Sequence, residues 1–392
     1  MHKISSKIKG FSVVKPGESI HQTTTSPVPQ PLISNDADRR IRFDLVPTPA
    51  EDTLKFITRP NDPNGHDARV YLVKSPEGLF NVTVVHTPNG TPNTGYPFEV
   101  WVQGDSMPRG LEAIAMNLSL DMRSIDRAYL LRKLEALKKV EGEPFTMVCP
   151  DGVERRMKGA IEAFATIVEH RFRQLGCLTE DALSVTPMVD AMIVRREPKA
   201  SDEGAICWGA PVHNTTTGDK FEVFLKEAES PTGQRIPVSI WFSGNVPRSF
   251  AGIEKLLSLD MRIVDPYWIG KKLRQLVDLH EKNGDFWAPV PGSGGKGKSY
   301  PSTLAYVADL VINRYTRLGL LTREGRPLKE NGVVQLALFK QRHDATAANE
   351  PNDANAPAIK GGLDCSKCGG VGTVIRMDGC LTCTSCSDSK CG

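Results

Sequence analysis

The sequence predicts an α+β protein in which a domain built from an antiparallel sheet, with helices on one face, occurs twice. A six-residue segment, Leu-Ser-Leu-Asp-Met-Arg, occurs at 118–123 and again, unchanged, at 257–262. Around each copy, strand-like segments come first and amphipathic helical segments follow. Segregated strands and helices are typical of the α+β class, and an ordered match of this length indicates an internal duplication.

The expected strands come first in each copy. In the first copy they are 78–86 and 97–102, where β-branched and aromatic residues dominate, and Asn89-Gly90 between them suits a tight turn. In the second copy, 220–226 and 236–242 take the same places. We therefore expect these strands to pair in an antiparallel sheet in both copies.

Three helices are expected after the strands of each copy. The first includes the repeated segment, and the second begins after Asp126 or Asp265, each of which is placed as an N-cap. The third has apolar residues at helical spacing, a pattern that predicts core packing. These residues are Ile161, Phe164, Ile167, Val168, Phe172 and Leu175 in the first copy, and Leu304, Val307, Leu310, Val311, Tyr315 and Leu318 in the second.

The chain has 392 residues, enough for two or three domains with sizeable cores. We place the first α+β repeat at 59–195 and the second at 200–340. The apolar stretch 333–339 is expected to pack back onto the second repeat as a final strand.

The remaining segments are polar or rich in cysteine. Residues 1–58 lack sustained periodicity, and we expect a mostly flexible arm with room for a short strand or helix between 41 and 57. The alternative is an arm that becomes ordered on contact with a partner. Residues 341–364 are rich in Ala, Asn, Asp and Pro and are expected to form a flexible linker. The tail, 365–392, is a separate Cys-rich segment.

Composition excludes several classes of function. A net charge of +3, from 49 basic and 46 acidic residues, gives no footprint of nucleic-acid binding or of membrane binding. No run of apolar residues approaches the 18 or so that a membrane span requires, and the N-terminal apolar stretch is too short for a secretion signal. We therefore expect a cytoplasmic protein, whose clustered cysteines serve metal or redox chemistry rather than a disulfide scaffold.

Six of the nine cysteines lie in the tail, and four of them form two Cys-x-x-Cys pairs. Cys365 and Cys368 make the first pair, and Cys380 and Cys383 make the second, eleven residues further on. Two such pairs supply four thiolates for one tetrahedral zinc ion. The alternative, a cluster of disulfides, does not suit a reducing compartment.

Two cysteines are left over by this division. Cys386 and Cys391 form a compact C-x4-C dithiol, and Lys390 beside it favours the reactive thiolate. If Cys383 and Cys386 supplied the second metal-binding pair instead, Cys380 and Cys391 would remain. We prefer the first division because its dithiol is compact. Unpaired surface thiols are the other interpretation of these two residues.

Residues 292–299 match the phosphate-binding pattern G-x-x-x-x-G-K-S. A nucleotide site of this kind needs a buried strand before the loop and a helix that begins at the lysine. The preceding segment, 287–291, contains two prolines, which do not suit a central strand. We therefore expect a Gly/Lys-rich loop and no nucleotide site.

The other candidate catalytic residues form no recognisable site. The eight histidines are scattered, and no serine elbow or catalytic triad can be argued. Cys149, Cys177 and Cys207 occur singly, and we expect each to be a small buried residue rather than a nucleophile.

With these residues identified, the chain resembles the C-terminal region of class II, adenosylcobalamin-dependent ribonucleotide reductases, in which a TSCPD-type domain precedes a Cys-rich zinc ribbon. That domain begins Arg-Pro, as at Arg59-Pro60, and 79–84 and 97–100 look like its first strands. Residues 113–123 are similar to its helix, and 379–392 are similar to its terminal Gly-Cys-x-x-Cys-x-x-Cys-Gly-Tyr-Ser-Lys-Cys-Gly.

The chain departs from that family in three ways. Ser387-Asp388 replaces the usual Gly-Tyr, the domain is present twice, and the chain has no room for the catalytic barrel with its corrin site. The resemblance therefore implies an accessory subunit of a split enzyme. It implies that adenosylcobalamin is bound by a separate catalytic chain.

The resemblance also implies the roles of the tail cysteines. Cys386 and Cys391 would reduce the disulfide left in the partner's active site after each turnover, and thioredoxin or glutaredoxin would reduce them in turn. The alternative hypothesis is a non-enzymatic interaction or regulatory protein with a purely structural zinc ribbon.

Overall fold

The protein is described by a computed structural model, which divides it into two compact units, 1–343 and 344–392. The described residues are 50–328, apart from 89–94, 105, 198, 201–203, 230–232 and 264, together with three strands at 374–377, 380–383 and 389–391. We call the described part of 50–328 the folded unit and 344–392 the tail unit. The expected arm before residue 50, the turn at Asn89-Gly90 and the strand at 333–339 lie outside the described residues.

The folded unit contains the same order of elements twice. In the first half (67–174) the elements are β1 (Asp67–Ser75), β2 (Gly78–Pro88), β3 (Gly95–Gln103), α1 (Leu111–Met122), α2 (Arg127–Leu137), β4 (Phe145–Val148), β5 (Glu154–Met157) and α3 (Ala160–Gln174). In the second half (207–317) they are β6 (Cys207–Asn214), β7 (Asp219–Glu229), β8 (Arg235–Asn245), α6 (Phe250–Met261), α7 (Pro266–Val277), β9 (Phe286–Pro289), β10 (Gly297–Tyr300) and α8 (Thr303–Arg317).

Short elements precede and join the halves. A 3-10 helix, η1 (Ala50–Thr53), lies before the first half, and two short helices, α4 (Glu180–Ser184) and α5 (Pro187–Asp190), follow α3. Each half has one three-stranded antiparallel sheet, with the strands in sequence order, and one two-stranded hairpin.

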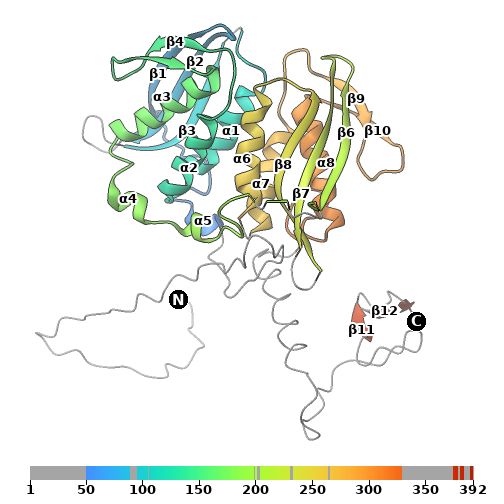
Figure 1. The fold of residues 1–392 in the computed structure, drawn as a ribbon. Helices are drawn as coiled ribbons and strands as arrows, with labels where there is room; N and C mark the ends of the chain where they lie inside the picture. The colour runs from blue at the N-terminus through green and yellow to red at the C-terminus, as the bar shows by residue number, and fades with distance from the viewer. Residues whose placement is uncertain are drawn as a thin grey trace, which may run out of the picture. The chain divides into compact units, whose positions relative to one another are not determined.

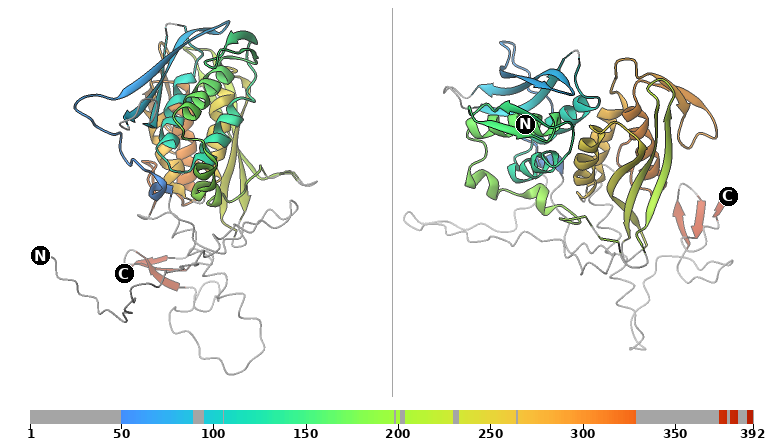
Figure 2. Two further views of the ribbon diagram at one scale, coloured as in Figure 1. Left: turned by 90° about the vertical axis from the view of Figure 1, so that its left-hand side faces the viewer. Right: turned by 45° about the horizontal axis from the view of Figure 1, so that its top comes forward.

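The helices of both halves lie between the two three-stranded sheets (Figures 1 and 2). Helices α1 and α6 pack against each other, and each also packs against the last strand of its own sheet. Each half has its own apolar core, and a third cluster, which includes Leu120, Tyr129, Leu259 and Trp268, fills the junction. This arrangement is the mixed α+β architecture that the sequence predicts.

The structure confirms most of the predicted elements and adds several. The four expected strands fall within β2, β3, β7 and β8, and the expected core stripes of α3 and α8 are buried, with Leu318 partly so. Strands β1 and β6 were not predicted, because β1 is largely exposed and β6 contains Pro211. Within the described residues, no helix is both long enough and apolar enough to cross a bilayer.

Asp126 and Asp265 are N-caps, as predicted. The Asp126 carboxylate accepts from the amide of Tyr129 at 2.7 Å, and its other oxygen accepts from Met188 and Val189 at the start of α5. The Asp265 carboxylate accepts from Tyr267 and, through its other oxygen, from Ala50 of η1. Each aspartate therefore joins two helical N-termini, which present unpaired amides to an anion.

The repeated six-residue segment has the same structural task in both halves. Its serine faces the outer edge of the sheet. The Ser119 hydroxyl accepts from the amide of Val100 at 3.0 Å and lies 3.1 Å from its carbonyl, and Ser258 makes the same two contacts with Ile240, at 3.0 and 3.2 Å. Edge strands leave such backbone groups without partners. The two serines accept from the edge amides of β3 and β8.

Candidate functional site

The most enclosed polar cluster of the folded unit is formed by four charged residues from four helices. Lys133 of α2 contacts Asp121 of α1 at 2.7 Å and Asp260 of α6 at 2.6 Å, and Lys272 of α7 contacts Asp121 at 2.8 Å. All four side chains have zero solvent exposure. The cluster pairs two basic side chains with two acidic ones, so their formal charges balance.

The two carboxylates of the cluster differ in their hydrogen bonds, because Asp260 has more partners than Asp121. Asp260 also accepts from the Tyr129 hydroxyl at 3.0 Å and the Trp268 indole at 2.8 Å. Burial alone would raise the pKa of Asp260, but the two lysines outweigh it and the pKa is lowered. For Asp121 burial prevails and its pKa is raised, and one of its oxygens has no hydrogen-bond partner.

Burial also lowers the pKa of Lys272 to about 8. A lysine with a lowered pKa can be a general base, but this one has no access to solvent or to a substrate. The cluster joins the four central helices of the two halves. We therefore interpret it as a structural lock.

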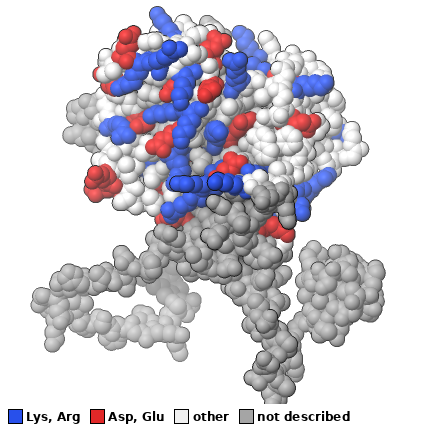
Figure 3. All heavy atoms as spheres, in the orientation of Figure 1, with Lys and Arg blue, Asp and Glu red and all other residues white. Residues whose placement is uncertain are grey.

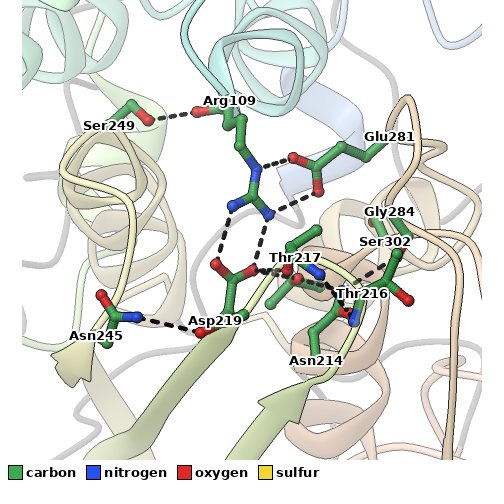
Figure 4. A network of polar contacts seen from close by, with 12 residues as sticks. Arg109, Asn214, Thr216, Thr217, Asp219, Asn245, Ser249, Glu281, Gly284 and Ser302 are labelled. Carbon is green, nitrogen blue, oxygen red and sulfur yellow. Dashed lines mark hydrogen bonds and ion pairs between the residues drawn. The ribbon is translucent and has the colours of Figure 1, made fainter.

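A second polar network ties the halves together at their surface. Arg109, before α1, donates to both carboxylate oxygens of Asp219 in β7, at 2.9 and 2.8 Å, and to Glu281 after α7 (Figure 4). Burial opposes the charge of Asp219, but hydrogen bonds from Arg109, Thr303 and a further threonine lower its pKa. Bidentate arginine–carboxylate pairs are strong and directional. We call Arg109, Asp219 and Glu281 the Arg109 clamp. Its charged groups are all paired with each other, and they join the two halves.

A cleft of about 690 Å³ lies beside the edge strand β8, between α2, α6 and the segment 195–197. Its charged lining comprises Arg132, Lys139, Arg195, Arg196, Lys255 and Arg262, and the acids Glu135, Glu197 and Glu254. Figure 3 shows lysine and arginine side chains gathered over the region of α2 and α6 on this face.

The equivalent place in the first half is nearly closed. A pocket of only about 100 Å³ lies there, beside β3 and α1. Glu99 and Gln275 line it where the cleft beside β8 has the smaller Ser239 and Ala136, and Met116 stands where that cleft has Lys255. Ser239 and Ala136 therefore give the cleft beside β8 more room, and Lys255 adds a positive charge to it, although Glu254 adds a negative one where the first pocket has Ala115.

The predicted metal and redox residues all lie in the tail unit, where the described residues form one small antiparallel sheet. Its strands are β11 (Val374–Met377), β12 (Cys380–Cys383) and β13 (Ser389–Cys391), in that order. Cys380 begins β12, Cys383 ends it, and Cys391 ends β13 directly opposite Cys380. Cys365, Cys368 and Cys386 lie outside the described residues.

The three cysteines of the folded unit are free thiols in different environments. Cys149 is buried, as expected, and Cys177 is partly buried, with its pKa raised by burial. The expectation for Cys207 is wrong, because this residue is exposed. It begins β6 at an exposed position of the strand, opposite Lys226 of β7.

The Gly/Lys-rich segment is a β-hairpin loop. Residue Gly297 begins β10, which pairs with β9, and Lys298 lies within the strand, 3.5 Å from Asp309. Helix α8 starts only at Thr303. The backbone that a phosphate loop needs, a helix beginning at the lysine, does not occur at this place, in agreement with the expectation from the sequence.

Comparison with models of known protein families, with curated proteins and with solved structures found no match. The buried lock was not predicted from the sequence, although each half contributes one aspartate and one lysine at equivalent positions. A lysine and an aspartate that recur beside apolar core positions were the available signal. Charged residues of helices are usually exposed to solvent, so the sequence alone did not predict that these four are buried.

Proposed function

We propose that this chain is the accessory subunit of a split, adenosylcobalamin-dependent ribonucleoside-diphosphate reductase, and that a dithiol in its tail relays electrons to the active site of the catalytic chain. The observation that carries the proposal is the tail, whose Cys-rich sequence resembles that of the class II reductases. Four tail cysteines would hold a structural zinc ion, whose thiolate donor set suits this metal. In this proposal the two halves of the folded unit are copies of one TSCPD-type domain.

The internal organisation of the folded unit supports an accessory role. In the two most elaborate polar networks among its described residues, the buried lock and the Arg109 clamp, every charged group is paired with another charged group of the same unit. A subunit without a catalytic centre of its own would supply a scaffold and a reductant. The corrin cofactor and the radical chemistry would belong to the partner.

The relay chemistry is a pair of thiol–disulfide exchanges. One thiolate of the tail dithiol attacks the partner's disulfide, forms a mixed disulfide and releases one partner thiol. The second tail thiolate attacks the mixed disulfide, so that the partner leaves with both thiols reduced and the tail holds a disulfide. Two electrons and two protons have moved to the partner. Thioredoxin or glutaredoxin then returns the tail to the dithiol by the same two steps.

The test combines this chain with its catalytic partner, thioredoxin, thioredoxin reductase and NADPH. Cys391 belongs to the dithiol in either division of the tail cysteines. We expect Cys391→Ser to abolish multiple turnover while one product per prereduced active site still forms. Full multiple turnover by this variant would overturn the proposal.

The alternative, a non-enzymatic interaction protein, makes a different prediction for the thiols. It expects the tail cysteines to be metal-bound or inert. Thiol titration of the zinc-loaded full chain, before and after addition of a chelator, separates the two. The relay requires two reactive tail thiols before the chelator is added. Cys207, which is exposed, must be replaced by serine for this count.

A further inference from the structure

The two three-stranded sheets of the folded unit have four edge strands, and three of these edges are protected. On β3 and β8 the serine of the repeated segment accepts from an edge amide. Edge strand β6 contains Pro211, which has no amide to donate, and it lies against β9. Proteins protect edge strands because unpaired backbone groups otherwise pair with another chain.

The fourth edge strand, β1, has none of these protections among the described residues. It is nine residues long and contains neither proline nor glycine, and no described strand pairs with its free edge. Its residues 67–70 are all exposed, although successive side chains point to opposite faces of a strand. The start of β1 is therefore uncovered on both faces.

The register of the first hairpin shows which residues of β1 direct their backbone groups to the free edge. Ser75 and Gly78 close a two-residue loop, and such a closing pair is hydrogen-bonded. Pairs alternate along the ladder, so every second residue before Ser75 points its amide and carbonyl away from β2. These residues are Ala68, Val70, Leu72 and Lys74. The amide of Leu79, opposite Lys74, agrees with this pattern, because it donates to Ser106 and not to β1.

Two of these outward-directed residues also have exposed apolar side chains. Val70 is 58% exposed and Leu72 is 55% exposed. At the equivalent places of the second half, β6 has Gly209 and Pro211. Gly209 has no side chain, and Pro211 has no amide. A partner strand can therefore pair with β1 along its whole length, but not with β6.

Strand β1 is complementary to a second copy of itself. If two β1 strands pair antiparallel about a twofold axis at Tyr71, Val70 of each copy lies opposite Leu72 of the other. Both residues direct their backbone groups outward, so each of these pairs can exchange two hydrogen bonds. The apolar side chains of each pair then lie on the same face of the joined sheet, where such cross-strand pairs are stabilising.

The charged residues of β1 do not oppose this register. Each charged residue lies directly opposite an uncharged residue of the other copy. These opposed pairs are Asp67–Ser75, Arg69–Val73 and Lys74–Ala68. Like charges directly opposite each other would destabilise the paired strands, and this register avoids them. With one acidic and two basic side chains, β1 has no strong charge that would select an acidic or a basic peptide instead.

We propose that the protein forms a dimer in which two β1 strands pair antiparallel about Tyr71 and join the first sheets of two copies into one sheet of six strands. The contact is only about 30 Å long. It belongs to the small interfaces, at or below about 1,200 Å², so dimerisation is expected at micromolar and not at nanomolar concentrations. This inference does not depend on the proposed function.

Sedimentation velocity of the full chain from about 1 to 100 μM, a range that spans micromolar dissociation constants, tests the dimer. Leu72→Pro gives β1 the residue that β6 has at this place. It removes one outward amide and leaves the bonds to β2 in place, so the sheet should persist. Leu72→Lys keeps the amide and adds a charge at the centre of the ladder. Each change is expected to weaken dimerisation at least tenfold, and circular dichroism shows whether the variant is folded.

The matched control is Leu79→Lys, which gives β2 the residue that β7 has at the equivalent place, Lys220. Leu79 is exposed on the same face of the sheet as Leu72, but it belongs to the central strand. This variant is expected to dimerise within twofold of the unchanged protein. An equal loss with Leu79→Lys would show that the copies pack face to face, and a dimer that persists in both Leu72 variants would place the contact elsewhere. Either result, or a monomer at all concentrations, would overturn the inference.

Amide exchange gives an independent readout of the edge itself. Exchange at Val70 and Leu72 is expected to slow as the concentration rises, whereas exchange at Tyr71 and Val73, which bond to β2, is expected to change little. Slow exchange at Val70 and Leu72 in the monomer, at every concentration, would show that another segment of the same chain covers β1. That result would also overturn the inference.

Discussion

The folded unit and the tail unit use their polar residues for opposite purposes. In the folded unit, the repeated segment supplies a serine for the sheet edge and an aspartate for the buried lock, in both halves alike. The tail cysteines occur once and lie on short strands or outside the described residues. The residues that are repeated in this chain therefore have structural roles. The proposed chemistry lies where the sequence is not repeated.

The largest effect on stability is expected from breaking the buried lock. Lys133→Met leaves Asp121 and Asp260 enclosed with one cation between them, and an uncompensated buried charge costs about 3–5 kcal/mol. Urea unfolding should show this loss in the free energy of unfolding. Cys391→Ser in the tail should leave the same transition unchanged. A loss below 1 kcal/mol for Lys133→Met would show that the lock is not what holds the helices together.

A smaller effect, equal in the two halves, is expected at the sheet edges. Ser119→Ala and Ser258→Ala each remove the hydroxyl that accepts from a buried backbone amide, at a cost of about 1–3 kcal/mol. Amide exchange should speed up at Val100 in the first variant and at Ile240 in the second. Very different costs for the two serines would break the equivalence of the halves.

The smallest expected effect is the pH dependence contributed by Lys272. Its pKa is about 8 in the folded protein against 10.5 when unperturbed, so between these values the unfolded chain binds more protons. Its contribution to the free energy of unfolding therefore rises with pH in this window, by at most about 1.4 kcal/mol per pH unit. The difference between the unchanged protein and Lys272→Met, measured from pH 8 to 9.5, isolates this rise from the buried tyrosines, whose raised pKa values act in the opposite direction. A flat difference would contradict the assignment.

Much of the folded unit could be predicted from its sequence, for identifiable reasons. The N-caps at Asp126 and Asp265 and the core stripes of α3 and α8 are local patterns, and the structure confirms them. Strand β1 was not predicted because its apolar residues Val70 and Leu72 are exposed. Its sequence therefore lacks the alternation of buried apolar and exposed polar residues that predicts a half-buried strand. The predicted burial of Cys207 failed because a cysteine's environment depends on tertiary packing.

The candidate sites were less predictable, because each depends on pairing across the chain. No local pattern predicts that Lys133 contacts Asp260. Nor does one predict that Gln275 lines the small pocket beside β3, whereas Ala136 lines the equivalent position of the cleft beside β8. In the tail, the spacing of the cysteines left two divisions open. Spacing alone contains no information on strand register, such as the pairing of Cys380 with Cys391 across β12 and β13.

The most direct test of the relay compares two reductants in the reconstituted enzyme. A small dithiol such as dithiothreitol can reach the partner's active-site disulfide by itself, whereas thioredoxin would need the tail. We predict that Cys391→Ser lowers thioredoxin-driven turnover at least a hundredfold and leaves dithiothreitol-driven turnover within about twofold of the unchanged protein. Equal loss with both reductants would assign Cys391 to the structure of the complex, and equal activity with both would contradict the relay.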